Sequence, residues 1–405
     1  MLKRVNLFIV LIILLVMLTP ILNRNVPRTI EIGLFGIWVL ITLLSLKFKW
    51  IIKNGKVILG ILLWQMLEFF YKFIGVSTAE YGNYMIGLFS YMLVIIGLYI
   101  NEEYSIKQKR LLVIFIVALV LFNVIDNIRL NDLYKGATND IYQEWASYLL
   151  LLNVAETGFY GANMMMIGGL LIYLSYASHY FERILIIVSI VVSLYFCFFI
   201  SPRATSCAFI IIEFIYIFFK RKQALRRYWI GGLLLLPVIC IFILPYTSSF
   251  SDDTMGDGFS RITERVTSVN DAVHGNKDDE SSFGARVNFT TMSINTFLDS
   301  PSNFLFGVGH HLDENGWRYG IGQHTRYADV LANYGILGAF SLLYLTVLLY
   351  RRYRSIMHMH WDVWKIVFIV YVLYGCVEHN RNVGMVIMLM IFAPSVYSLI
   401  NEIKK

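Results

Sequence analysis

Charged residues are scarce in this sequence. Asp, Glu, Lys and Arg make up 15% of the 405 residues, whereas hydrophobic residues make up 58% and the mean hydropathy is +0.63. An ordinary soluble domain carries about 25% charged residues. The composition therefore excludes an ordinary soluble protein and predicts a protein that is mostly embedded in a membrane.

Cysteine is scarce as well, and a nucleotide-binding motif is lacking. The four cysteines, Cys197, Cys207, Cys240 and Cys376, all fall in strongly apolar stretches. The one long polar stretch, 247–326, contains none, so it is not a domain held together by disulfides. No G-x-x-x-x-G-K phosphate-binding loop occurs in the sequence, which argues against an ATP-driven machine.

Long apolar runs, by contrast, recur along the chain, and each is long enough to cross about 30 Å of hydrocarbon as a helix. They predict an all-α polytopic membrane protein with about twelve spans, at roughly 5–22, 30–46, 57–75, 83–100, 111–127, 159–178, 184–201, 204–219, 229–246, 327–350, 362–379 and 383–400. The first run has no small-residue cleavage site, so we expect a retained anchor. The predicted divisions are 1–246 for spans one to nine, 247–326 for one large loop and 327–405 for spans ten to twelve.

Lys and Arg are distributed unevenly between the two sets of loops. One set holds dense groups such as 220–227 and 351–354, together with both chain ends, whereas the other holds isolated residues such as Arg24 and Arg129. The positive-inside rule then places both termini in the cytoplasm and the large loop outside the cytoplasmic (inner) membrane. These anchoring loops explain the net charge of +7, so we expect no nucleic-acid binding.

An arginine stands in the tight turn between the seventh and eighth predicted spans. The sequence Ser201-Pro202-Arg203-Ala204 is so short a connection that Arg203 must lie at the membrane surface, between two helix ends. There its guanidinium group can hold phosphate oxygens in a bidentate fork. It can equally anchor the turn to lipid headgroups, and the sequence leaves both roles open.

The large loop carries a second arginine at the start of a helix-compatible stretch. Gly284-Ala285-Arg286 opens this stretch, which runs to Leu298. Its apolar side is expected to contain Phe289, Met292 and Phe297, with Val287 and Ile294 nearby. Residues 299–309 follow and are predicted to form a turn and a Gly-rich strap.

Histidines lie in the second half of the loop. His324 comes directly before the tenth span, where an imidazole can act as a base near neutral pH. His310 and His311, with Asp313 and Glu314, match no zinc-binding spacing. We therefore expect a base in this region and no metal cofactor.

Four segments together resemble the bacterial O-antigen and capsular polysaccharide repeat-unit polymerases (Wzy-type) and the related O-antigen ligases. The segments are Thr157–Asn163, Ser201–Ala204, Gly284–Arg286 with Pro301 and Phe306–Gly309, and His324–Tyr327 with Tyr334–Gly338. The resemblance covers roughly residues 157–340. It implies a GT-C-like helical fold and a metal-independent, inverting glycosyl transfer that needs no cofactor.

The resemblance also implies substrates and site residues. The donor would be an undecaprenyl-diphosphate-linked glycan, and the acceptor a sugar hydroxyl on another lipid-linked repeat unit. Arg203 and Arg286 would stabilise the diphosphate leaving group, and His324, oriented by Asp329, would receive the acceptor proton. The further substrate-binding candidates are Asn163, Arg318, Arg326, Tyr327 and Arg381. Expected partners are membrane lipid, a chain-length regulator and a flippase.

Two other functions fit parts of the sequence. A ligase that transfers finished glycan to lipid A core would use the same chemistry. A lipid-linked glycan flippase is favoured by the number of spans and by charged residues within them, such as Glu68, Lys72 and Glu213. The lack of an inverted repeat and the arginines of the large exterior loop favour the polymerase.

Overall fold

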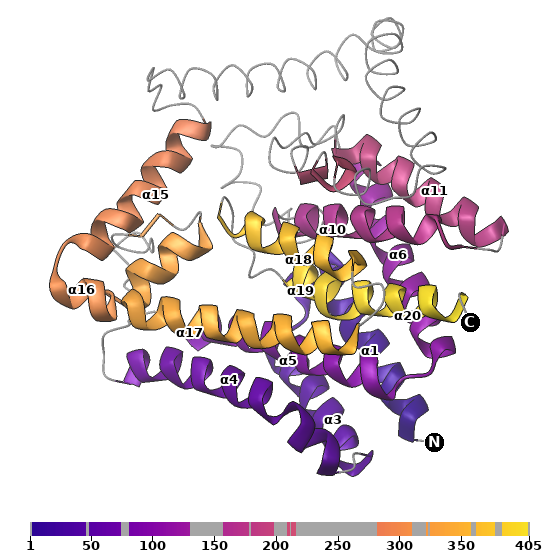
Figure 1. Ribbon diagram of the computed structural model, residues 1–405, viewed down its shortest axis with the longest axis horizontal. Helices are drawn as coiled ribbons and strands as arrows, with labels where there is room; N and C mark the ends of the chain where they lie inside the picture. The colour runs from indigo at the N-terminus through magenta and orange to yellow at the C-terminus, as the bar shows by residue number, and fades with distance from the viewer. Residues whose placement is uncertain are drawn as a thin grey trace, which may run out of the picture.

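The structure of the protein is a computed structural model, which describes residues 2–45, 48–73, 81–129, 157–177, 180–197, 209–210, 212–215, 282–309, 321–322, 325–357, 362–376 and 383–403. Every regular element within these ranges is a helix (Figure 1). The elements are α1 (Leu2–Leu18), α2 (Pro20–Asn25), α3 (Arg28–Ser45), α4 (Phe48–Phe73), α5 (Tyr81–Glu103), α6 (Ile106–Arg129), α10 (Thr157–Leu174), α11 (Tyr180–Tyr195), α15 (Ser282–Leu298), α16 (Pro301–Phe306), α17 (Arg326–Ile356), α18 (Asp362–Tyr374), α19 (Val383–Ile387), η2 (Met388–Phe392) and α20 (Ala393–Ile403).

Apolar helices of membrane-spanning length recur in the described part of the chain. The helices that are both long enough and apolar enough to cross a membrane are Trp50–Tyr71, Ile106–Arg129, Arg326–Ile356 and Val383–Glu402. Shorter apolar helices occur at Tyr160–Leu174 and Val363–Tyr374. The prediction of an all-α polytopic membrane protein is confirmed. The count of about twelve spans and the three divisions stay predictions, because residues 216–281 lie outside the described ranges.

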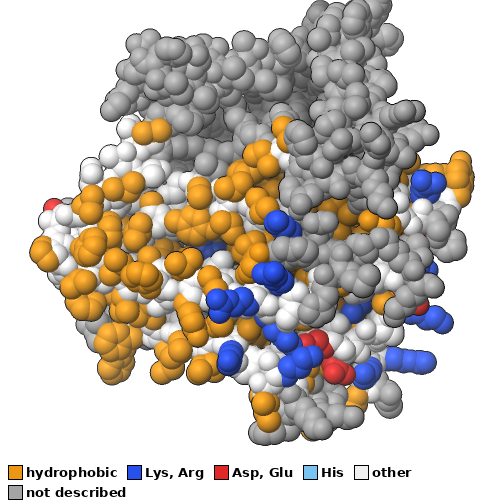
Figure 2. Space-filling model, viewed as in Figure 1, with side chains coloured by type: hydrophobic (Ala, Val, Ile, Leu, Met, Phe, Trp, Pro, Cys, Tyr) orange, Lys and Arg blue, Asp and Glu red, His pale blue; other side chains and the backbone are white. Residues whose placement is uncertain are grey.

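The two described chain ends lie together at one end of the helix bundle, where Lys and Arg side chains gather (Figure 1, Figure 2). Lys3 of α1 forms an ion pair of 3.2 Å with Glu103 of α5. Glu102 accepts a hydrogen bond from Arg352 of α17 and pairs with Lys53 of α4 at 3.1 Å. These contacts hold α1, α4, α5 and α17 together at what we call the basic end. Residues predicted to be cytoplasmic therefore lie on one side, whereas which side faces the cytoplasm stays a prediction.

The first predicted span is interrupted by a proline. α1 ends at Leu18 and α2 begins at Pro20, whereas the sequence predicted one continuous span over 5–22. Proline has no amide hydrogen and its ring clashes with the preceding turn, so the helix breaks here. The side-chain amide of Asn123 in α6 donates to the Leu18 carbonyl oxygen at 2.8 Å, which pairs a carbonyl at the end of α1.

The last predicted span also departs from a regular helix, because the π-helix η2 separates α19 from α20. A π-helical turn takes backbone carbonyls out of the regular α-helical hydrogen-bond pattern. Trp364 Nε1 donates to the Leu389 carbonyl at 3.0 Å, and the Tyr353 hydroxyl donates to the Met390 carbonyl at 3.2 Å. All four residues are buried, so these bonds fasten α17 and α18 to the wide turn deep in the bundle.

Residues 299–309, predicted to be a turn and a strap, contain the short helix α16. The Ser300 hydroxyl caps this helix by accepting a hydrogen bond from the Asn303 amide at 3.1 Å, and Pro301 occupies its first position. Serine at the N-cap followed by proline is a helix-start signal, and it accounts for the short helix at this point of the sequence. Residues 307–309, which follow the helix, are non-helical, and we call them the strap.

α17 is broken at Gly335, where the backbone has φ 61° and ψ −160°. A break leaves carbonyls at the end of the first half of a helix without their intrahelical partners. The strap supplies the donors: the Val308 amide bonds to the Ala332 carbonyl, and the Gly309 amide bonds to the Asn333 carbonyl, each at 2.8 Å. The strap therefore caps the first half of α17.

This contact requires glycine on both sides. A Cβ atom on Gly307 would lie 2.4 Å from the Asn333 carbonyl carbon, and one on Gly335 would lie 2.5 Å from the Leu305 carbonyl carbon. Both glycines also have positive φ, which other residues adopt only with strain. Two glycine motifs that are distant in the sequence thus form one backbone contact, which we call the glycine joint.

Aromatic residues hold the glycine joint against α4. The Tyr71 hydroxyl donates to the Phe306 carbonyl next to the strap. The rings of Tyr71 and Trp64 meet Tyr334 edge to face, with centroids 5.2 and 5.6 Å away. The joint therefore lies where α4 ends, opposite the basic end, and we call this side the loop end.

Replacing Gly335 with alanine tests the glycine joint. We expect Gly335→Ala to lower the thermal unfolding midpoint in detergent, because the new methyl group overlaps the Leu305 backbone and the residue must keep a positive φ. Such strain costs on the order of 2 kcal/mol. Gly36→Ala in α3 is the matched control, since no atom lies within 4 Å of its added Cβ. Equal unfolding midpoints for the two variants would contradict the joint.

Candidate active site

The motif segments that the structure describes around the large loop meet at the loop end. α15 and α16 contact each other, and both contact α17. In Figure 1 they lie on the left, away from the chain termini. We call α15, α16, the strap, residues 321–322 and the first half of α17 the loop junction. It contains the helix to which Arg286 belongs and the chain on both sides of His324.

A buried chain of hydrogen bonds runs through the loop junction. The Ser293 hydroxyl donates to Asp329 Oδ1 at 2.7 Å and accepts a hydrogen bond from the Gly322 amide at 2.9 Å. Ser293 is fully buried, and Asp329 is 2% exposed. A hydrogen bond to a carboxylate contributes more than one between neutral groups. This chain therefore joins three segments: α15, α17 and the residues that lead to His324.

The small size of Gly322 allows these segments to touch. A Cβ atom at this position would lie 2.1 Å from the Phe289 carbonyl oxygen of α15. His324 itself lies outside the described residues, but Gly322 before it and Thr325 after it are both buried. The chain on either side of His324 is thus held within the protein.

Arg286 lies in α15, although its side chain is outside the described part of the structure. Its position is seven residues before Ser293, about two helical turns, so the two positions share one face of the helix. Ser293 uses that face to reach Asp329 on α17. The register of α15 therefore sets the position of Arg286 on the face that packs against α17.

Sequence reasoning missed Ser293 and assigned the buried face of α15 only in part. Phe289 and Phe297 are half-buried on either side of Ser293, whereas Met292 and Ile294 are exposed. The sequence signal for this role was the position of Ser293 between Phe289 and Phe297, each about one helical turn away. Such a residue on a buried face needs a hydrogen-bond partner, and here the partner is Asp329.

Asp329 was expected to orient His324. Its observed bond goes to Ser293, which in turn holds Gly322, two residues before the histidine. In the described contacts, Asp329 is therefore linked to the segment before His324 through Ser293. A direct bond to His324 stays a prediction.

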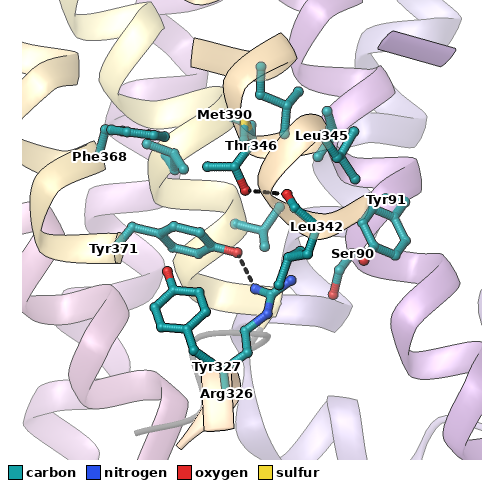
Figure 3. Close-up of a pocket in the computed structure, with 14 residues that line it drawn as sticks. Ser90, Tyr91, Arg326, Tyr327, Leu342, Leu345, Thr346, Phe368, Tyr371 and Met390 are labelled. Atoms are coloured by element: carbon teal, nitrogen blue, oxygen red, sulfur yellow. Dashed lines mark hydrogen bonds between the residues drawn. The ribbon is translucent and has the colours of Figure 1, made fainter. Parts of the chain in front are cut away.

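Arg326 and Tyr327, two predicted substrate-binding residues, fasten the first turn of α17 to α18. Arg326 Nη1 donates to the Tyr371 hydroxyl at 2.8 Å, and the Tyr327 hydroxyl donates to the Val372 carbonyl at 3.1 Å. Figure 3 shows the Arg326 side chain directed towards Tyr371. Arg326 is 8% exposed, so its guanidinium group lies inside the protein.

Arg326 lines a small cavity between α5, α17, α18 and the α19–η2 segment (Figure 3). The cavity measures about 40 Å³, and apolar side chains such as Leu345 and Phe368 form much of its wall. Ligand pockets usually measure about 300 Å³ or more, whereas a water molecule needs only about 15 Å³. In this structure the cavity has room for water beside the arginine but no room for a sugar.

Asn163, the predicted substrate-binding residue of α10, is buried inside the helix bundle. Its side-chain amide donates to Cys197 Sγ just after α11, at 3.3 Å, and its carbonyl oxygen has no partner among the described residues. It takes no part in the hydrogen-bond chain of the loop junction as far as that chain is described. The remaining candidates lie outside the described residues, namely Arg203, Arg318 and Arg381.

Within the described ranges, no candidate metal site is found. No three His, Cys, Asp or Glu side chains come together there as metal ligands. Glu68, one of the charged residues predicted within a span, accepts a hydrogen bond from Gln65 Nε2 at 2.7 Å. The segment with His310 and His311 lies outside these ranges.

Comparison with known proteins points to one family. Residues 188–343 match the family model described as O-Antigen ligase, and this range contains all elements of the loop junction. Comparison with curated proteins gave no match. The members of the matching family are glycosyltransferase-like enzymes that use lipid-linked glycans in the membrane. The match supports membership of the O-antigen ligase/polymerase superfamily and a function in polysaccharide biosynthesis, and the apolar helices indicate an integral membrane protein.

Proposed function

We propose that this protein is a polymerase that joins undecaprenyl-diphosphate-linked oligosaccharide repeat units into O-antigen or capsular polysaccharide on the outer face of the cytoplasmic membrane. The observation that best supports this proposal is the loop junction. Ser293 bonds to Asp329 and to Gly322, so the helix of Arg286 and the segment before His324 meet on the first turns of α17. The helix that carries the proposed cation, Arg286, therefore lies next to residues that precede the proposed base, His324, in the sequence.

The proposed reaction is a single displacement. The acceptor hydroxyl oxygen attacks the anomeric carbon of the donor glycan while the bond from that carbon to the diphosphate oxygen breaks. His324 takes the hydroxyl proton, and the lipid diphosphate leaves with its added negative charge. Arg203 and Arg286 stabilise this charge, because a guanidinium group presents paired donors that fit phosphate oxygens. One displacement inverts the configuration at the anomeric carbon.

Asp329 acts in this scheme as a positioning residue. Its carboxylate holds Ser293, and Ser293 holds both α15 and the Gly322 amide. Displacements of about 1 Å at a reacting group lower enzymatic rates strongly. A buried bond that fixes two segments at once is therefore suited to hold Arg286 and His324 at a constant separation.

Alanine substitutions test the proposed chemical roles. We expect His324→Ala to lower polymerisation by about 10²–10⁴-fold and Arg203→Ala or Arg286→Ala by about 10²–10³-fold, while each variant still reaches the membrane. EDTA should leave the activity intact. The measurement is polymer formation by purified protein on lipid-linked repeat units.

Arg129→Ala is the matched control for the arginine variants. Arg129 is 78% exposed and pairs only within its own helix to Asp126 among the ion pairs described, so its loss should change little. Near wild-type activity of purified His324→Ala would exclude the proposed base. Loss of activity in EDTA with recovery on adding a divalent ion would instead establish a metal requirement.

The positioning role predicts a coupled effect of Ser293 and Asp329. Ser293→Ala should lower kcat about tenfold to a hundredfold with little change in KM, because a hydrogen bond to a carboxylate contributes about 1.5–3 kcal/mol. Ser293→Ala combined with Asp329→Ala should lower kcat by less than the product of the two single effects, since both changes remove the bond between Ser293 and Asp329. Additive losses in this cycle would contradict the coupling.

Ser341→Ala is the control for the serine variant. The Ser341 hydroxyl bonds to the Leu337 carbonyl of its own helix and is exposed, so it links no separate segments. Its replacement should leave both kcat and KM unchanged. An equal loss in both serine variants would indicate a general sensitivity of α17 and not a role of Ser293.

Deletion of the gene tests the overall function. We expect a surface glycan consisting of core capped with a single repeat unit, without the ladder of longer chains on a gel. The ligase is the second candidate, favoured by the description of the matching family model. Uncapped core with long polymer still on the lipid carrier would identify the ligase, and repeat units trapped at the cytoplasmic face would identify a flippase.

A further inference from the structure

The exposed side of α15 divides into an apolar and a polar stripe. Val287, Ile294 and Leu298 are 41%, 40% and 61% exposed, and their spacing of seven and four residues places them on one line along the helix. The neighbouring line carries the exposed polar residues Asn288, Thr291 and Asn295, with the exposed Met292 at its far edge. A helix with one apolar and one polar outer stripe has the pattern of a helix that lies at a membrane surface.

The packing of α15 keeps the apolar stripe turned outwards. Ser293 is tied to Asp329 on the opposite, buried face, so rotation of the helix would break this bond. The rings of Phe297 and Phe304 pack at 4.9 Å and hold α15 against α16. The stripe therefore cannot be buried by rolling the helix into the protein.

The apolar stripe is continuous with the sides of the membrane-spanning helices. On α16, Leu305 and Phe306 are 47% and 53% exposed, and Phe306 is bonded to Tyr71 at the end of α4. On the spanning helices themselves, Phe70 of α4 and Phe340 of α17 are 55% and 63% exposed. Figure 2 shows hydrophobic side chains spread over this side of the molecule. The six residues of α16 carry no charge, and the exposed Asp299 is the single charged residue between Leu298 and α16.

We propose that the apolar stripe of α15, together with Leu305 and Phe306 of α16, contacts the acyl chains of membrane lipids. This part of the loop predicted over 247–326 then lies in the surface of the bilayer, with the Asn288–Asn295 side of α15 facing water. Continuity with the lipid-facing sides of α4 and α17 favours lipid over a partner protein. An exposed apolar patch of this kind needs an apolar occupant, and acyl chains already surround the adjoining helices.

The position at the bilayer surface has a consequence for the substrate, which rests on the proposed polymerase function. The phosphates of a lipid-linked glycan lie at headgroup level, because the carrier lipid is held in the hydrocarbon. Arg286 is part of α15 and is thereby kept at that level by the contact of the helix with lipid. The apolar stripe would thus set the depth of the proposed leaving-group arginine.

Spin labels along α15 test the proposal in the full-length protein. The protein is reconstituted in nanodiscs of phosphatidylethanolamine and phosphatidylglycerol after replacement of its cysteines, and single labels are placed at Val287, Ile294 and Leu298 or at Asn288 and Asn295. We expect molecular oxygen, which concentrates in lipid, to relax the first set. A water-soluble nickel complex should relax the second set.

Two results would overturn the proposal. Equal access of the nickel complex to Leu298 and Asn295 would place the stripe in water, and exclusion of both reagents from Leu298 would show that protein covers it. Where the cysteine-free protein does not fold, benzoylphenylalanine at position 298 or 295 replaces the labels. Irradiation should attach lipid at 298 and not at 295, and the opposite result would exclude lipid contact. These readouts need no enzymatic activity, so failure of the polymerase assignment leaves them unaffected.

Discussion

The glycine joint is the contact on which the arrangement of the loop end depends. A helix that breaks inside a membrane protein exposes carbonyl groups that lipid cannot satisfy, and each unsatisfied group is costly. The amides of Val308 and Gly309 satisfy the carbonyls before the break, and Gly307 and Gly335 have no side chains to keep the backbones apart. Because α16 leads directly into the strap, the same contact sets the position of α16, and α15 packs on α16 and α17.

Backbone hydrogen bonds and side-chain hydrogen bonds have different roles at the proposed site. Backbone bonds hold the strap and α17, and they depend on chain geometry more than on side-chain chemistry. Side-chain bonds then add the segments with chemical groups, through Ser293, Asp329 and the Gly322 amide. At the basic end, Glu102 and Arg352 fasten the other end of α17 to α5, so the long helix is held at both ends.

The spanning helices were largely predictable because each needs only a long apolar run, which is a local property. The interruptions were less predictable. Pro20 is visible in the sequence, but the predicted span over 5–22 did not take its break of the helix into account. The π-helix η2 is stabilised by hydrogen-bond donors from α17 and α18, which no local sequence pattern reveals. At the candidate site, Arg326 and Tyr327 were expected at the start of a span and are found there. Their bonds to Tyr371 and Val372, however, depend on where α18 lies.

The sequence by itself determined that this is a helical membrane protein, and its glycine, arginine and histidine motifs indicated the superfamily. These conclusions rest on hydropathy, charge and motif order, all of which can be read along the chain. Only the tertiary structure decided that Gly307 meets Gly335 and that Ser293 bonds to Asp329. It also decided that Ile294 and Leu298 face outwards from α15. Which residues meet, and which face remains exposed, depends on the packing of distant segments, because a helix alone has several faces that could be buried.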